Sequence, residues 1–171
     1  VAERLAVTGS STGQTVARLE DRGLVRVDVY RTLRLTPAGE LRIEPVAELQ
    51  TLRQAPRRFA ELGLVAGQSG WLEGWQGDSL EIEAVFEAGP EAEFGLRLLA
   101  SPDGQEQTRL IYSGREQYLR LETDQASLSP AVDRSLRQAP LSLAGGELRL
   151  RVFVDRSVVE VFANGHTCLA G

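Results

Sequence analysis

The sequence predicts a mainly β protein, a two-sheet antiparallel β-sandwich with a small helical segment at its N-terminus. From residue 57 onward, short runs of alternating apolar and polar residues follow one another, and this period of two is typical of half-buried strands. Turn-forming pairs separate the runs, among them Gln76-Gly77, Ser113-Gly114 and Asn164-Gly165. Apolar residues make up 42% of the 171 residues, which is enough to bury a core.

Ten strands are expected in the sandwich, over residues 57–62, 69–75, 78–88, 92–100, 107–113, 116–123, 140–143, 147–155, 158–163 and 166–170. The clearest pair is 147–155 with 158–163. A tight turn at Arg156-Ser157 pairs four valines across these strands on one face, Val152 with Val161 and Val154 with Val159. We expect that face to contribute to the core.

The N-terminal region has the order of a winged helix-turn-helix. Residues 1–7 and 11–22 read as helices, and Gly23 is a suitable helix stop. Residues 24–29 and 32–35 then alternate as two short strands. Pro45 suits the first position of a short helix that runs to about residue 53. The expected division is therefore a partial winged helix-turn-helix segment over 1–40, a linker helix over 41–56 and the sandwich over 57–171.

Composition excludes several classes of site and location. Cys168 is the only cysteine, so no internal disulfide is possible, and one cysteine with one histidine cannot build a structural zinc site. We expect no metal and no cofactor. No apolar stretch approaches the ~20 residues of a membrane span, so no membrane partner is expected. No signal peptide is visible, and the predicted location is cytoplasmic.

The C-terminal hairpin carries a family signature. Residues 152–165 read Val-Phe-Val-Asp-Arg-Ser-Val-Val-Glu-Val-Phe-Ala-Asn-Gly, which closely resembles the signature near the end of the β-sandwich module in glycoside hydrolase family 32. Residues 41–53 look like the short helix that links the catalytic propeller of those enzymes to the sandwich. Segments 77–82 and 94–98 fall where that module has strands. The resemblance covers about residues 33–171, and the family contains invertases, levanases and other β-fructosidases that act on sucrose and fructans.

The catalytic half of such an enzyme is missing from this chain. Retaining glycosidases need two carboxylates about 5 Å apart. The family carries its acids in Asn-Asp-Pro-Asn-Gly, Arg-Asp-Pro and Glu-Cys motifs, whereas this chain has no Asp-Pro, no Glu-Cys and a single asparagine, Asn164. The resemblance therefore implies a glycoside hydrolase family but a chain that is inactive alone, and we assign no catalytic residue.

Three aromatic residues are candidates for carbohydrate binding: Trp71, Trp75 and Tyr112. Aromatic faces suit the apolar side of a sugar ring. Trp71 and Trp75 have the same parity in a strand, so both can line one surface. The alternative is that these rings fill the core of the sandwich. A fructo-oligosaccharide is the expected sugar partner.

Residues 1–40 resemble the winged helix of diphtheria-toxin-repressor-type metalloregulators, although the preceding helix and the later dimerisation helices are absent. Segments 14–20, 23–25 and 35–39 carry this second resemblance. It implies DNA contacts for six residues: Thr8, Ser11, Gln14, Thr15, Arg18 and Arg34. DNA is a partner only in this alternative, in which the chain is a transcriptional regulator with the sandwich as its sugar sensor.

The main functional hypothesis is a non-catalytic accessory module of a family 32 β-fructosidase. In the family this module packs on the propeller and supports its stability. We therefore expect an exposed apolar patch that binds the propeller or, in the isolated chain, drives self-association. A third hypothesis is that the chain is an inactive relic without a ligand. The sequence does not distinguish this hypothesis from the accessory module.

Overall fold

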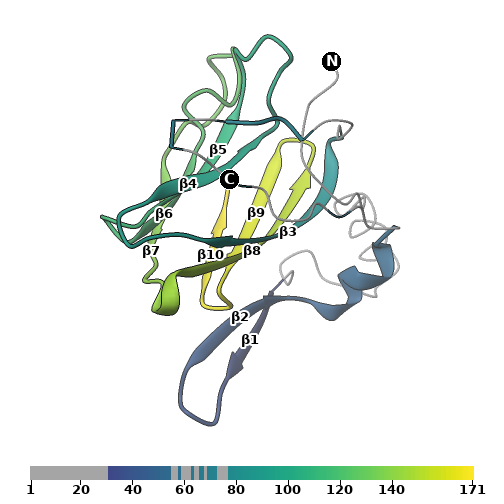
Figure 1. Ribbon diagram of the computed structural model, residues 1–171. Helices are drawn as coiled ribbons and strands as arrows, with labels where there is room; N and C mark the ends of the chain where they lie inside the picture. The colour runs from purple at the N-terminus through teal and green to yellow at the C-terminus, as the bar shows by residue number, and fades with distance from the viewer. Residues whose placement is uncertain (1–30, 55–57, 59–62, 64–65, 68, 73–76) are drawn as a thin grey trace.

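A computed structural model describes residues 31–54, 58, 63, 66–67, 69–72 and 77–171, which form a mainly β structure with two short 3₁₀ helices (Figure 1). The helices expected over 1–7 and 11–22 and the strand expected over 24–29 lie outside the described residues. So does the strand expected over 57–62, apart from Arg58, which is not in a strand.

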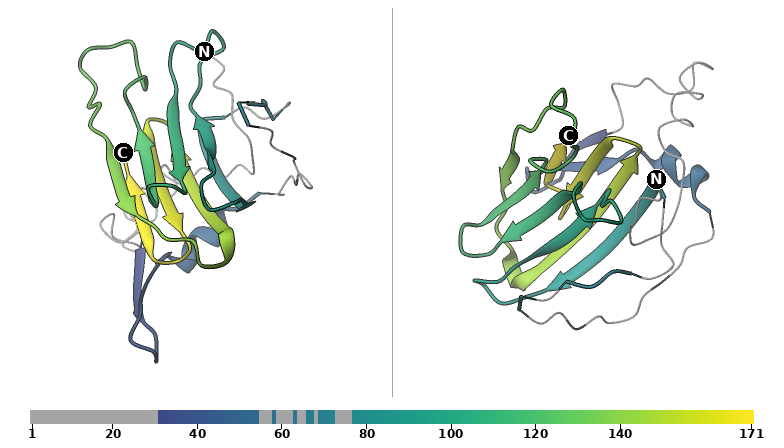
Figure 2. Two further views of the ribbon diagram at one scale, coloured as in Figure 1. Left: turned by 60° about the vertical axis from the view of Figure 1, so that its left-hand side comes forward. Right: turned by 90° about the horizontal axis from the view of Figure 1, so that it is seen from above.

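Two antiparallel sheets of four strands form the sandwich, and Figure 2 shows them packed face to face. One sheet has the order β10-β9-β8-β3, with β3 at Ser79–Glu87, β8 at Glu147–Asp155, β9 at Val158–Ala163 and β10 at Thr167–Ala170. The other has the order β4-β5-β6-β7, with β4 at Glu93–Leu98, β5 at Thr108–Ser113, β6 at Tyr118–Glu122 and β7 at Arg137–Pro140. The predicted two-sheet sandwich is thus confirmed.

The core lies between the inward faces of the two sheets. Its most deeply buried side chains are Ile82, Leu98, Leu110, Leu119, Leu121, Leu148, Val152, Val154, Val159 and Val161. Burying each such side chain stabilises the fold by about 1.5–3 kcal/mol. The predicted register of the closing hairpin is correct, because Val152 pairs with Val161 and Val154 with Val159.

Two strand predictions are wrong in position. The strand expected over 140–143 is β7, which ends at Pro140. Beyond it Leu141 continues the pairing by one bond, from its N–H to the carbonyl of Gln117, but residues 141–143 are not in a strand. Residues 69–72 of the strand expected over 69–75 are not in a strand, and 73–75 lie outside the described residues.

A separate hairpin precedes the sandwich and corrects the reading of residues 32–56. Strand β1 (Arg31–Leu35) pairs with β2 (Leu41–Pro45), a pairing that the winged-helix order did not predict, and the partner that it did predict, residues 24–29, lies outside the described residues. Thr36 donates its N–H to the carbonyl of Glu40 and accepts one from Gly39, which closes the turn. The linker helix expected over 41–56 is reduced to a 3₁₀ helix, η1 (Ala47–Leu52). The reason is that residues 41–45 alternate with the period of a strand.

No helix among the described residues is long and apolar enough to cross a membrane. Within the same residues, no group of three or more His, Cys, Asp or Glu side chains is arranged to hold a metal ion.

Candidate functional site

Part of the outer face of the β10-β9-β8-β3 sheet is covered by the linker that precedes the sandwich. Leu49 of η1 is buried against Phe153 of β8 and Phe162 of β9, with Ile43 and Leu52 packed around them. The two phenylalanine rings meet edge to face, with their centroids 6.0 Å apart. The linker therefore packs on the sandwich through its own small core.

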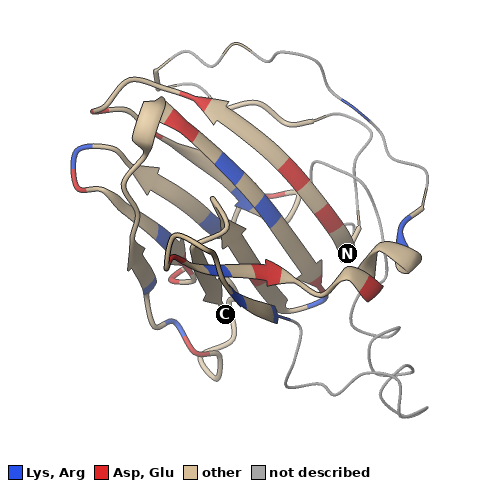
Figure 3. Ribbon diagram, turned by 90° about the horizontal axis from the view of Figure 1, so that it is seen from below, with Lys and Arg blue, Asp and Glu red and all other residues tan. Residues whose placement is uncertain are grey.

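A cluster of ion pairs lies beside this small core. Arg53, directly after η1, donates from Nε and Nη2 to the two carboxylate oxygens of Glu81, at 2.8 and 2.6 Å. Arg151 of β8 donates from Nε to Glu81 at 2.5 Å, and Arg53 also reaches Glu83 at 2.5 Å. Figure 3 shows the acidic side of β3 beside the basic side of β8. We call Arg53, Glu81, Glu83 and Arg151 the linker clamp.

Glu81 is the centre of the linker clamp and is only 2% exposed. Its alternation with Leu80 and Ile82 places it on the outer face of the sheet, away from the main core, and there Arg53 and Arg151 cover its carboxylate. Burial by itself raises the pKa of Glu81, but the hydrogen bonds and charges of the two arginines outweigh it and hold the pKa below its usual value. The same bonds raise the pKa of Arg53.

The hairpin β1–β2 is fixed to the sandwich along β2 and at Arg31. Ile43 donates its N–H to the carbonyl of Gly165 at 2.7 Å, and His166 Nδ1 lies 3.2 Å from the carbonyl of Leu41. Arg31 pairs with Glu160 of β9 at 2.9 Å. The tip of the hairpin projects from the sandwich (Figures 1 and 2).

One face of the hairpin is apolar and exposed. The register places Leu33 opposite Ile43 and Leu35 opposite Leu41, so all four share a face. The other face carries the pairs Thr32–Glu44 and Arg34–Arg42. Ile43 packs into the small core of the linker, but Leu33, Leu35 and Leu41 are 65%, 75% and 52% exposed. We call Leu33, Leu35 and Leu41 the hairpin face.

The structure describes two of the three predicted carbohydrate residues, Tyr112 and Trp71, and of these two Trp71 is the exposed one. Tyr112 of β5 is 3% exposed and its ring packs on Phe94, with centroids 5.5 Å apart, so it belongs to the core. Burial raises the pKa of the Tyr112 hydroxyl. Trp71 is 46% exposed and not in a strand, and Trp75 lies outside the described residues.

Of the residues predicted to contact DNA, only Arg34 is described; it is exposed on β1. The other five, namely Thr8, Ser11, Gln14, Thr15 and Arg18, lie outside the described residues. Because β1 pairs with β2, Arg34 belongs to the hairpin before the linker.

The hairpin face and the linker clamp were both missed by sequence reasoning. The hairpin face had a readable signal, since Leu33, Leu35, Leu41 and Ile43 alternate on either side of a Pro-Ala-Gly turn. The linker clamp had none, because Arg53 and Glu81 are 28 residues apart and only the tertiary fold brings them together.

Comparison with known proteins agrees with this geometry. Residues 48–171, well over half of the chain, match the sequence profile of a family described as "Glycosyl hydrolases family 32 C terminal". The chain belongs to this family. It is 36% identical over 126 residues to a levanase from Bacillus subtilis (strain 168), a match that covers 70% of this chain and 18% of the levanase. The chain thus spans less than a fifth of the length of that relative.

Solved structures show the same fold. The chain superposes on fructan 1-exohydrolase IIa from Cichorium intybus with a TM-score of 0.70 and 20% sequence identity, over 82% of this chain and 34% of that one. A 62-residue stretch, 36% of this chain, is 40% identical to a diphtheria toxin repressor from Corynebacterium efficiens and covers 26% of it. That stretch is too small a part of either chain to assign a family.

Proposed function

We propose that this chain is a non-catalytic accessory module of a family 32 β-fructosidase, which docks on the catalytic propeller and supports its stability. The observation that carries the proposal is the hairpin face. It is an exposed apolar surface held in a fixed position at the point where the chain enters the sandwich.

An isolated two-stranded sheet is at best marginally stable in water. In the described part of the chain no strand pairs with the free edge of β1, and the hairpin face is not covered. A partner sheet that pairs with β1 satisfies its free backbone groups and buries Leu33 and Leu35 in one step. The catalytic domain of the same enzyme is the partner that family membership supports.

The match to the chicory enzyme supports the same partner. It covers 82% of this chain, which is more than residues 48–171, so the shared fold extends into the residues before position 48. The hairpin precedes position 48 and, among the described residues, contacts the sandwich through Arg31, Leu41 and Ile43.

The linker clamp gives the docking a fixed geometry. Arg53 is held by two carboxylates of β3, and Leu49 is buried four residues earlier. Linkers without such contacts leave two domains free to move relative to each other. We infer that the linker clamp keeps the sandwich and the propeller in one orientation.

Co-elution tests this function. The catalytic domain of the B. subtilis levanase, produced without its own C-terminal segment, is mixed with this chain and passed over a sizing column with light scattering. We expect a 1:1 complex. The double variant Leu33→Ser/Leu35→Ser should lose it.

The matched control is Thr32→Ser/Arg34→Ser, on the opposite face of the same strand, which should retain the complex. The function is wrong if the native chain does not co-elute, or if the Leu33/Leu35 variant co-elutes as well as the control does.

A second copy of the chain is the alternative occupant of the hairpin face when no propeller is present. Apolar side chains on a surface with an open strand edge favour edge-to-edge pairing. Self-association of the isolated chain is therefore part of the proposal.

A further inference from the structure

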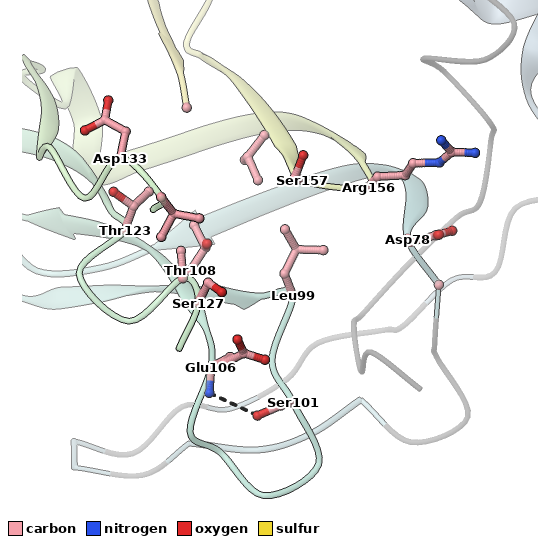
Figure 4. A pocket seen from close by; sticks show the side chains of 15 residues that line it. Asp78, Leu99, Ser101, Glu106, Thr108, Thr123, Ser127, Asp133, Arg156 and Ser157 are labelled. Atoms are coloured by element: carbon pink, nitrogen blue, oxygen red, sulfur yellow. Dashed lines mark hydrogen bonds between the residues drawn. The ribbon is translucent and has the colours of Figure 1, made fainter. Parts of the chain in front are cut away.

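One end of the sandwich opens into a cleft of about 950 Å³ between the two sheets (Figure 4). This volume lies within the usual range of small-molecule sites. The turn between β8 and β9, the loops β4–β5 and β6–β7 and the residues before β3 form its walls. The cleft and the hairpin lie at opposite ends of β9, since Ser157 lines the cleft while Gly165 contacts β2. We call it the end cleft.

The lining of the end cleft is rich in hydroxyl groups. Two come from the β4–β5 segment, two from the β6–β7 segment and one from the β8–β9 turn: Ser101, Thr108, Thr123, Ser127 and Ser157. Three of them already make hydrogen bonds inside the protein, Ser101 with Asp103 and the N–H of Glu106, Thr123 with the carbonyl of Ser135, and Ser127 with the N–H of Ser129. A hydroxyl has one donor and two acceptor positions, so each keeps at least one position for a ligand. Apolar side chains lie among them, namely Leu99, Val132 and Val159. In Figure 4, Thr108, Thr123 and Ser127 lie close together on one side of the cleft, and Leu99 lies beside them. This mixture suits a ligand with many hydroxyls and small C–H patches.

The charges of the end cleft do not favour an anion. Its charged side chains are Asp78, Glu106, Asp133 and Arg156. Asp133 is paired with Arg137 at 2.5 Å, and Glu106 accepts the N–H of Leu128 at 2.7 Å. Asp78 and Arg156 carry opposite formal charges, so the acid that no cation offsets is Glu106. Among these residues a phosphate or carboxylate ligand can pair with one arginine, Arg156, and is repelled by the carboxylate of Glu106.

We propose that the end cleft binds a neutral oligosaccharide chain. The proposal rests on the proposed function, because an accessory module of a fructan-hydrolysing enzyme works in the presence of such chains. The hydroxyls and backbone groups of the cleft bond the sugar hydroxyls, while Leu99 and the exposed Val132 contact its C–H faces. The proposed sugar site does not include Tyr112, which is buried in the core.

An amide-resolved NMR titration of the full chain tests the proposal. The probes are inulin-type and levan-type tetrasaccharides, maltotetraose, and glucose 6-phosphate as an anionic sugar. We expect saturable shifts at Leu99, Thr108 and Ser127 with a neutral oligosaccharide, at a dissociation constant of about 1 mM or below. Little or no shift is expected with the sugar phosphate.

Two matched variants locate the site. Ser127→Trp places a large ring in the cleft and should abolish the shifts, whereas Ser129→Trp, in the same loop but outside the lining, should leave them unchanged. The proposal is overturned by an absence of saturable shifts up to about 10 mM, by binding of the sugar phosphate alone, or by equal binding to the two variants.

This outcome is independent of docking. The hairpin variants and the cleft variants are at opposite ends of β9, so co-elution with a catalytic domain can succeed or fail without changing the titration. A chain that docks but does not bind sugar contradicts only the end cleft. A chain that does neither contradicts both proposals.

Discussion

Glu81 shows how much a single residue can do outside the main core. It is an acid on the outer face of a sheet, yet it is almost fully buried and accepts hydrogen bonds from Arg53 and Arg151. Removing one partner from a buried ion pair leaves the others without compensation. The linker clamp therefore ties the linker to the sandwich through this carboxylate.

We predict that Glu81→Gln lowers the free energy of unfolding by about 2–3 kcal/mol at pH 7. The value is at the low end for buried pairs because the Arg53 side chain is 37% exposed and can recover some hydration. Urea unfolding followed by circular dichroism measures the change. Glu87→Gln, at the exposed end of the same strand, is the matched control and should alter stability by less than about 0.5 kcal/mol.

The effect of Glu81 should depend on pH in one direction. Its pKa is lowered in the folded state from a reference of 4.5, so the stability that it contributes is present above about pH 4.5 and is lost as the pH falls through the folded-state value. The difference in unfolding free energy between the native chain and Glu81→Gln should therefore shrink at acidic pH. A difference that stays constant between pH 7 and pH 3 would show that the charge of Glu81 plays no part.

Gly95 is a second position where one residue decides local structure. A Cβ atom added there would lie 1.9 Å from the carbonyl oxygen of Leu110 on the neighbouring strand, and this backbone cannot move without opening the β4–β5 ladder. We predict that Gly95→Ala destabilises the fold by about 3 kcal/mol in thermal or urea unfolding. Gly89→Ala, where an added Cβ meets open space, is the control. Equal stability of the two variants would contradict this packing.

At the scale of elements, local sequence predicted the C-terminal hairpins well. Asn164 and Gly165 have φ of 49° and 70°, the left-handed values that an Asn-Gly turn adopts between two strands. Arg156, with φ of 54°, turns β8 into β9, and the valine pairs follow from that turn. In these hairpins the strands are neighbours in sequence, so turn and register are encoded together.

The β1–β2 hairpin could not be predicted in the same way. The alternation of residues 32–35 shows that they form a strand but does not say which neighbour they pair with, residues 24–29 or residues 41–45. The aromatic residues have a related problem, since strand parity cannot say which face is inside. Parity therefore left two alternatives for Tyr112, a sugar site or the core, and its ring packs on Phe94 in the core.

The hairpin face should determine whether the isolated chain self-associates. We predict that light scattering of the native chain finds a mass above that of one copy at high concentration, and that Leu33→Ser/Leu35→Ser shifts it toward the monomer. The reason is that Leu33 and Leu35 are the exposed apolar side chains of β1. The Thr32→Ser/Arg34→Ser control should behave as the native chain does. A native chain that stays monomeric at high concentration would contradict the prediction.

At the scale of the whole molecule, the sandwich separates two surfaces at opposite ends of β9. One end carries the hairpin, the other carries the end cleft, and the linker clamp lies between them on the outer face of the sheet, since Glu81 is in register with Phe153 and Glu160. The family assignment could be made from residues 152–165 and the linker, because these segments keep their pattern in the sequence. The end cleft could not be predicted, since its walls come from loops that are far apart in the chain.

The central claim is that this module supports a catalytic propeller. The most direct test uses the catalytic domain of the B. subtilis levanase, produced without its C-terminal segment and held at a temperature that slowly inactivates it. The half-life of its fructan-hydrolysing activity is measured. Adding this chain should lengthen the half-life several-fold, and adding Leu33→Ser/Leu35→Ser should not. A half-life unchanged by the native chain at concentrations well above that of the enzyme would contradict the account.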